Sequence, residues 1–481
     1  MTAIEERTNP AAFPEIAVFS DPNRSWDKKR EECSNPLEVA LCQQIESEIQ
    51  ALCQPYRNLN TPWTDFWSVT PGYSQLPMER LEAITRQVAT LTKVYDFTND
   101  YFGSPLAERF GTNIDTSVPA YFRLDALSST QPLNSVINAE VGTVPVGEGE
   151  VTAMRRVYQE LLGGDVSSFL PGSAQTLAKL FRESFGQNEP IRIVLPPRRL
   201  GYLGDYQFVS QYCQEQGLDV QVEDPKDLHL EDNQLVGKYG TARVIYRGFQ
   251  LSDLEGENDF AEADLLLDCI GKERVTLFPQ ITYWDRKDLL GLLFQPEIRE
   301  ALATGVGPET ANSFYRMFPW TWVCDRSKPP MLNGEFKPWS YFKEVTTQKG
   351  NNQRKPGFIL KPINGREARG LVFRWQVSSN QWSHALDDAL CLDHGQPGYI
   401  IQQDADDSLE RFVGTYWDRE NNVMVRNGGY RDRLCVNTFV SGRSDDGARQ
   451  VIIGDIDHTL RRNTRLIHTA SDAIHVPTYV I

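Results

Sequence analysis

The sequence predicts a mixed protein in which a helical N-terminal region precedes α/β and α+β parts. Apolar residues recur at helical spacing over the first 115 or so positions, and from residue 119 short apolar runs are broken by Gly and Pro. The 481 residues are enough for roughly two to four domains. We expect four segments, at 1–118, 119–188, 189–275 and 276–481.

Two long helices account for the first segment, because residues 35–56 and 77–102 both carry apolar side chains at i, i+3 and i+4. After position 119, the runs 119–127 and 134–147 contain the Gly and Pro punctuation of short strands and turns. This change of pattern places the first boundary near residue 118.

Strand-like runs and helices alternate in the third segment, which favours a small α/β unit with a largely parallel sheet. The runs are RIVLPP, LDVQVED, ARVIYRGF and ADLLLDCI, and DYQFVSQYCQEQ is a helix. A helix is expected over 285–305. From 357 to 460, strand-like runs follow one another and predict a mostly antiparallel module.

Composition narrows the classes of partner. The net charge of −16 and the pI near 5.0 argue against general binding to nucleic acid or to an anionic membrane. No apolar stretch approaches the ~18 residues of a membrane span, and residues 1–18 lack the pattern of a secretory signal. We expect a cytoplasmic protein that acts on small molecules, and a homodimer is left open.

The eight cysteines are scattered without a C-x-x-C pair, and the six histidines are equally dispersed. We interpret the cysteines as buried thiols of a reducing compartment rather than as disulfides. Zinc chemistry is not expected, because no pair has metal-ligand spacing.

The stretch FILKPINGREARGLVF, residues 358–373, carries the most informative motif. Lys361 ends a strand-like run, and a polar loop with Gly365, Arg366 and Gly370 leads to a return strand. Glycines let a backbone approach a ligand closely, and the two cations could hold phosphate. The alternative is a hairpin with a charged, solvated turn.

Two neighbouring features fit a nucleotide site. Gln402 and Gln403 end the apolar run GYIIQQ, where a hinge strand could offer backbone groups to an adenine. Lys287 stands at the start of a predicted helix, from which a second lysine could reach phosphate. In isolation, a lysine such as Lys287 is more often a solvated surface residue.

The run LKPINGREARGLVF resembles the phosphate loop of the glutathionylspermidine synthetase branch of the ATP-grasp superfamily, whose ATP-grasp module is circularly permuted. In that loop, Glu367 belongs to the Gly-Arg-Glu element. YFRLDALSSTQPLNSVINAEVGTVP is similar to the metal motifs of the same branch: Arg123 and Asp125 match R-x-D, and Asn138 matches the asparagine of Glu-x-Asn. The resemblance covers most of 119–460 and implies ATP and Mg²⁺ as cofactors.

One position departs from the family. Val136 stands where the family has a metal-binding glutamate, and Glu140, two residues beyond Asn138, is a candidate replacement. Asp455 and Asp457 are further candidates, although acids at a strand end are often solvated. Magnesium needs hard oxygen ligands, so the departure puts two-metal geometry in doubt.

Arginines near the C-terminus could grip a γ-phosphate or a substrate carboxylate. The family comparison favours Arg431 or Arg433, since an arginine on that strand commonly faces the active site. Surface salt bridges to the excess acids are the alternative.

The resemblance implies an ATP-dependent ligase that phosphorylates an acceptor oxygen and then joins the acceptor to an amine. Arg123 would stabilise the transferred phosphate, and Asp125 with Asn138 would position magnesium. The expected substrates are a small-molecule acid or enol and an amine or amino acid. The chain also resembles the ATP-grasp enzymes that join glycine to a cyclohexenone, 4-deoxygadusol, to give mycosporine-glycine. The alternatives are a peptide-forming or polyamine-forming ligase and a degenerate ATP-grasp scaffold without turnover.

Overall fold

The computed structural model describes most of the chain. Its described residues are 31–33, 35–53, 67–107, 111, 113–128, 136–163, 170–250, 253–254, 262–344, 357–363, 370–391, 398–404, 411–418, 421–444, 449–462 and 473–480. For residues 31–33, 53, 67–68, 128, 136–140, 198, 411–415, 426–432, 460–462 and 473, only the backbone is described.

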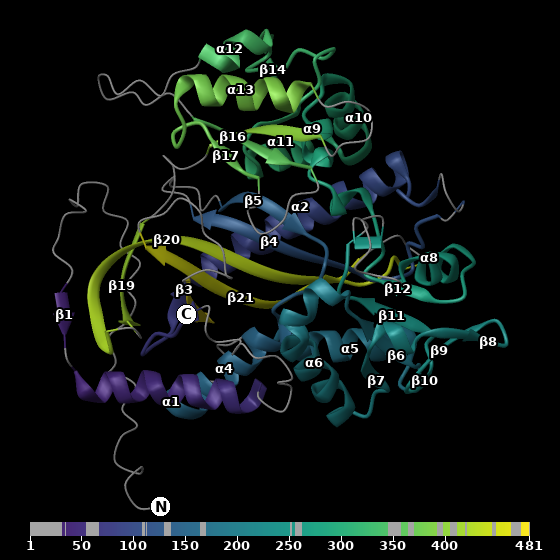
Figure 1. Cartoon of the computed structure of the whole chain (residues 1–481), viewed down its shortest axis with the longest axis vertical. Coiled ribbons are helices and arrows are strands. Elements are labelled where there is room, and N and C mark those ends of the chain that lie inside the picture. The colour runs from purple at the N-terminus through teal and green to yellow at the C-terminus, as the bar shows by residue number, and fades with distance from the viewer. Residues whose placement is uncertain are drawn as a thin grey trace, which may run out of the picture.

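A sheet of nine described strands forms the centre of the molecule (Figure 1). Its main order is β2-β22-β21-β20-β4-β5; β1 and β19 also pair with β20, and β3 pairs with β22. The bounds are β1 (Glu31–Cys33), β2 (Trp67–Ser68), β3 (Ser74–Leu76), β4 (Ala120–Ser128), β5 (Val136–Gly142), β19 (Arg411–Asp418), β20 (Val423–Val440), β21 (Val451–Arg462) and β22 (Ala473–Val480). Segments from both ends of the sequence therefore build one sheet.

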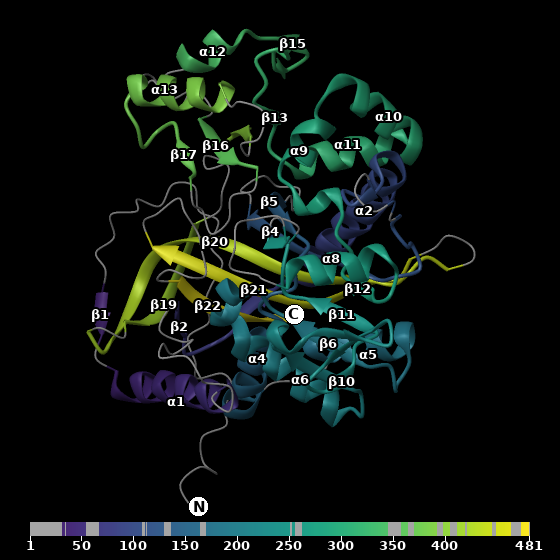
Figure 2. The ribbon, with the colours of Figure 1, turned by 45° about the vertical axis from the view of Figure 1, so that its right-hand side comes forward.

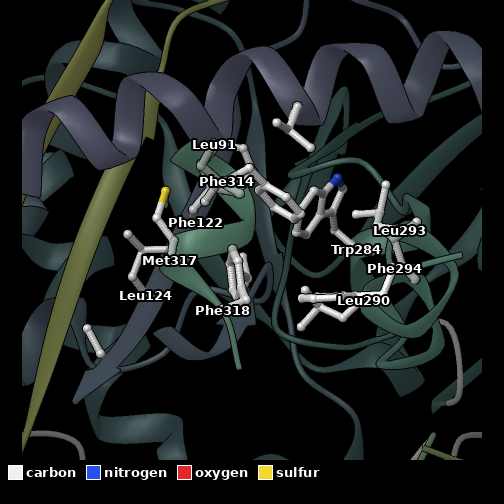
Figure 3. Packing of buried hydrophobic residues seen from close by; sticks show 14 of the residues in the cluster. Leu91, Phe122, Leu124, Trp284, Leu290, Leu293, Phe294, Phe314, Met317 and Phe318 are labelled. Carbon is white, nitrogen blue, oxygen red and sulfur yellow. The ribbon is translucent and has the colours of Figure 1, made fainter. Parts of the chain in front are cut away.

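The two faces of this sheet differ in chemistry because side chains alternate along each strand. Phe122, Leu124 and Leu434 lie on an apolar face that packs against helices. Those helices are α2 (Met78–Phe102), α9 (Asp288–Leu293), α10 (Pro296–Val306) and α11 (Pro308–Met317). The 3₁₀ turn η7 (Tyr283–Asp285) packs in the same core. Figure 3 shows Phe122 and Leu124 near Leu91 of α2 and near Phe314 and Met317 of α11.

The opposite face carries the residues between these apolar ones, among them Arg123, Asp125, Cys435 and Asp455. It is covered by α4 (Glu148–Leu162) and α5 (Ser173–Phe185), since Asp455 bonds to residues of both helices. The sheet thus places charged side chains in a buried layer, where each needs a partner.

The parallel sheet expected in the third segment is present, with the order β12-β11-β6-β7, but its fourth strand lies just beyond residue 275 and is not the predicted one. Its strands are β6 (Ile191–Val194), β7 (Val220–Glu223), β11 (Val244–Arg247) and β12 (Thr276–Phe278). The run ADLLLDCI lies in a helix, α8 (Ala263–Gly271), and the fourth strand is β12. The other elements are η5 (Pro197–Tyr202), α6 (Leu203–Glu215), η6 (Pro225–Asp227), β8 (His229–Glu231), β9 (Gln234–Gly237) and β10 (Gly240–Thr241).

A smaller antiparallel sheet, of order β13-β18-β16-β17, lies between two helices and the large sheet in both Figure 1 and Figure 2. Its strands are β13 (Thr321–Val323), β16 (Phe358–Pro362), β17 (Val372–Phe373) and β18 (Tyr399–Gln403). The helices are α12 (Trp339–Glu344) and α13 (Ser379–Leu390), and β14 (Met331–Leu332) pairs with β15 (Glu335–Phe336). The predicted antiparallel module is therefore divided between two sheets.

The N-terminal segment contains the two expected helices, α1 (Pro36–Cys53) and α2, but not as a separate helical unit. Its strands β1, β2 and β3 pair with β20 and β22 of the C-terminal segment. Among the described cysteines, four are buried (Cys42, Cys213, Cys269 and Cys435), whereas Cys391 is exposed. In the described helices, no stretch is both long and apolar enough to cross a membrane.

Candidate functional site

The R-x-D motif lies on β4, and the structure brings Arg433 of β20 to it. Arg123 Nε donates to Asp125 Oδ1 at 3.0 Å, and Arg433 Nη1 donates to Asp125 Oδ2 at 3.3 Å. Asp125 is only 7% exposed, and its charge raises the pKa of Arg123 well above the usual range. The sequence analysis named Arg123 and Asp125 together in the R-x-D motif and Arg433 apart from them. In the fold the three residues form one buried cluster, which we call the arginine clamp.

The magnesium assignment depends on β5. The register pairs Asp125 with Glu140 and Ala126 with Asn138, with an irregularity between positions 125 and 126. The backbones of the three predicted ligands are therefore adjacent, as a shared metal requires. The side chains of Asn138 and Glu140 lie outside the description, so the ligand set stays a prediction. Among the described residues, no group of three His, Cys, Asp or Glu side chains could hold a metal.

The two acids proposed as replacement ligands have other partners. Asp455 accepts from Ser173 N at 2.6 Å, at the start of α5, and from Arg155 Nη1 at 3.1 Å. Burial raises the pKa of Asp455 to about 6. Asp457 lies 3.4 Å from His475 Nδ1. Asp455 therefore holds α4 and α5 against the sheet, and nothing in its contacts supports a role at magnesium.

Side chains alternate between the two faces of a strand, and this alternation determines which residues of the small sheet could face a nucleotide. Phe358 and Leu360 of β16 pack into the core with Phe342 of α12, so Lys361 lies on the face turned away from that helix. The register pairs Ile359 with Gln402, which places Gln402 on the same face as Lys361. Figure 1 shows the large sheet beyond this face.

The adenine prediction is corrected in part. Gln402 Nε2 donates to Thr321 Oγ1 at 2.9 Å, and Gln403 N donates to the carbonyl of Trp320 at 2.8 Å. These donors are used within the sheet, because β18 is a central strand with a neighbour on each side. The backbone N–H of Gln403 is therefore not available for adenine.

A pocket lies where the small sheet, α9 and the end of β5 meet. It is a small pocket that opens to solvent, and its walls include Gly142, Thr143, Trp284, Lys287 and Ile363. The backbone N–H of Lys287 donates to the carbonyl of Ile363 at 3.5 Å, and Lys287 is the N-cap of α9, as the sequence predicts.

The predicted phosphate loop begins directly after Ile363. Gly365, Arg366 and Glu367 lie outside the described residues, so their roles remain predictions. At the far end of the loop, Gly370 has φ +73°, and a Cβ there would lie 2.8 Å from Pro362 Cγ. A glycine is required at this position for both reasons. The side chain of Arg431 also lies outside the description, although its backbone pairs with Arg461 on β21.

The arginine clamp adjoins the pocket. The register pairs Arg123 with Gly142, and a Cβ on Gly142 would lie 3.8 Å from Arg123 Nη2. The sequence analysis missed Trp284 and Thr143 as walls of the pocket. It also missed a group of buried acids at the start of α4, for which the only signal was two glutamates, Glu148 and Glu150, in the first turn of a helix.

Among solved structures, this chain is similar to a glutathione synthetase-like effector from Globodera pallida in its apo form. The TM-score is 0.57 at 11% identity, over 94% of this chain and 100% of the other. A protein named as a gamma-glutamylcysteine synthetase from Methylobacillus flagellatus gives a TM-score of 0.40 at 10% identity, over 86% of this chain and 87% of the other, and supports no conclusion. No protein-family model and no curated protein sequence matches the chain. The chain therefore shares the fold of a glutathione synthetase-like protein.

Proposed function

We propose that the protein is an ATP-dependent ligase of circularly permuted ATP-grasp architecture that forms a C–N bond. The observation that carries the proposal is the meeting of three predicted elements at one pocket. Lys287 and Ile363, the residue before the phosphate loop, line it, and Arg123 is the strand partner of the pocket residue Gly142. The shared fold with a glutathione synthetase-like protein supports the same reading.

In this proposal the chain supplies positioning and charge rather than a nucleophile. Lys361 and Lys287 neutralise the phosphates, and Arg123 with Arg433 faces the transferred phosphoryl group. Magnesium, held by Asp125 with Asn138 or Glu140, would supply charge neutralisation at the phosphate oxygens. Because Asp125 now accepts from two arginines, binding of MgATP would require one of these bonds to be exchanged.

The acceptor is a small acid or enol whose oxygen is phosphorylated, and the amine then displaces phosphate. The walls of the pocket combine apolar residues (Trp284 and Leu290) with polar ones (Thr143 and Gln250), which suits a small, partly polar molecule. The comparisons give no support for a cyclohexenone in particular. Glycine with 4-deoxygadusol is therefore one pair to be tested among other acids and amines, including the polyamines.

The test is release of ADP and phosphate by the purified protein with MgATP, with pooled acids or enols and pooled amines, separately and together. We expect ADP only when an acid or enol and an amine are both present. Lys361→Ala should abolish this turnover, and Lys328→Ala, which alters an exposed lysine in the region of the small sheet, should not.

A binding scaffold without turnover is the rival, since Val136 stands at the usual glutamate position. ATP binding without ADP formation in any pool would favour the scaffold. Val136→Glu then separates the two: restored turnover would mean that the missing carboxylate is the defect.

A further inference from the structure

The N-terminus of α4 is held by a carboxylate from α6. Asp205 accepts hydrogen bonds from the backbone N–H groups of Gly147, Gly149 and Glu150 at 2.8, 2.7 and 2.9 Å. A Cβ on Gly149 would lie 2.3 Å from the Asp205 carbonyl oxygen, so only glycine permits this approach of α4 to α6. Asp205 is therefore fully used as a helix cap.

Glu148 in the same turn has no such partners. It is 0% exposed, and neither carboxylate oxygen has a hydrogen-bond partner among the described residues. The Tyr121 hydroxyl donates to Asn437 Oδ1 at 2.9 Å, and it also lies near enough to Glu148 to lower the pKa of that carboxyl, against the larger effects of burial and of Asp205. Oε1 of Glu150 is buried without a partner as well.

A second buried group points to the same place from another sheet. The hydroxyl of Tyr246 on β11 is also without a described partner, and the charge of Glu148 helps raise the pKa of Tyr246 well above its usual range, after burial itself. Buried polar atoms without partners normally mark the position of a bound molecule or water. Here such atoms come from α4, through Glu148 and Glu150, and from β11, through Tyr246.

The charged groups around Glu148 and Glu150 determine whether a bound molecule would be a cation or an anion. The titratable groups that interact with these two glutamates lie on four neighbouring elements: Tyr121 and Arg123 of β4, Asp205 and Tyr206 of α6, Tyr246 of β11 and Asp457 of β21. Together with Glu148 and Glu150, this set holds four acids and a single arginine, so the site favours a cation. The tyrosine rings suit an organic cation, and an ammonium group has three donors for several acceptors.

We propose that Glu148 and Glu150 bind the ammonium group of the amine substrate, an inference that rests on the proposed ligase function. The site adjoins the arginine clamp, because Arg123 Nη1 donates to the carbonyl of Val146 at 3.5 Å. Thr143 lines the pocket, and residues 143–147 lead from it directly into α4. The amine is thereby placed beside the group that would activate its acceptor.

The number of protons released when the amine binds can be measured, and it would not change if Glu148 had a purely structural role. Burial, with the charge of Asp205, raises the pKa of Glu148 to about 8, so this group holds a proton at pH 7. When an ammonium group binds, Glu148 becomes a carboxylate paired with the cation and its proton passes to the buffer. Burial also raises the pKa of Glu150 well above its ordinary value. We therefore expect the protein to release protons to the buffer when an amine binds.

The experiment is titration calorimetry of the full chain with 1,4-diaminobutane and with glycine methyl ester, in two buffers of different ionisation enthalpy. Glu148→Gln and Glu150→Gln should each weaken amine binding at least ten-fold, and Glu148→Gln should also lower the number of protons released. Glutamine resembles the protonated acid in size and charge, so the variant should remain folded, which its melting temperature checks. Glu160→Gln on the exposed side of α4, where Glu160 pairs with Arg156 at 3.0 Å, should change nothing.

Equal amine affinity in wild type and Glu148→Gln would overturn the inference, as would the absence of binding by either amine to the wild type. Tetramethylammonium, which has no donor, should bind at least ten-fold more weakly; equal binding would also overturn it. The two proposals fail separately. Amine binding that depends on Glu148 without any ADP formation would remove the ligase and keep the amine site, whereas turnover with an unchanged amine KM in Glu148→Gln would do the reverse.

Discussion

Replacing Asp125 by asparagine tests whether the arginine clamp is a buried charge cluster. Its carboxylate lies 3.0 Å from Arg123 Nε and 3.3 Å from Arg433 Nη1, with the Asp125 side chain 10% exposed. At an effective dielectric constant of about 20, one such pair has a gross attraction of about 5 kcal/mol. Removing one partner of a buried pair typically costs about 3–5 kcal/mol. Asparagine keeps one acceptor oxygen, so we expect a loss of about 3 kcal/mol.

The assay is urea unfolding, with Asp219→Asn as the matched control. Asp219 also pairs with a buried arginine at 3.0 Å, but its side chain is 43% exposed. Water therefore screens that pair, and about 1 kcal/mol or less is expected. A loss in Asp125→Asn no larger than in Asp219→Asn would refute the reasoning, because the carboxylate would then not be the counter-charge of the clamp.

Three further changes test other parts of the structure. Lys361→Ala should weaken binding of a non-hydrolysable ATP analogue at least ten-fold by calorimetry, with Lys328→Ala unchanged; retained affinity would place the phosphates elsewhere. The folded pKa of Glu148, about 8, lies above its usual value of 4.5, so the folded state keeps a proton that the unfolded state has lost. Stability from this group should therefore fall by about 1.4 kcal/mol per pH unit between these values, and Glu148→Gln should remove that slope in urea titrations, whereas an unchanged slope would locate the titration in another group. Gly291→Ala should lower the free energy of unfolding by about 1–3 kcal/mol, because a Cβ there would lie 2.8 Å from Val323 Cγ2 and from the Val323 backbone N. Gly201→Ala is the control, since a Cβ at Gly201 would have nothing within 4 Å. Equal urea midpoints in the two variants would mean that α9 is not packed tightly on β13.

Local patterns predicted the parts of the fold that local chemistry determines. The parallel unit follows from alternating strands and helices, and the β16–β17 hairpin follows from two apolar runs around a glycine-containing loop. Lys287 was placed correctly at a helix start because the apolar periodicity begins immediately after it.

The same local patterns could not predict the pairing of strands that lie far apart in the sequence. The strands β1 to β3 are two or three residues long, too short for periodicity, and are stabilised by β20 and β22 from the other end of the chain. The backbone N–H of Gln403 was wrongly assigned to adenine for a related reason, since a run of apolar residues ending in amides does not reveal that its strand will be central.

For the arginine clamp, the contact between the R-x-D motif and Arg433 was not predicted. Arg123, Asp125 and Arg433 were each named, but the contact between Asp125 and Arg433 spans 308 positions and depends on the register of β4 with β20. Glu148 escaped because a glutamate in the first turn of a helix is usually exposed and favoured there by the helix dipole. Only the packing of α4 beneath the sheet makes it a buried acid.

A structure of the protein with Mg²⁺ and a non-hydrolysable ATP analogue is the most direct test of the central claim. The account predicts that the nucleotide lies between the small sheet and the end of β5, with its phosphates at Lys361 and Lys287 and the metal at Asp125. A nucleotide bound elsewhere, or phosphates that contact neither lysine, would contradict it.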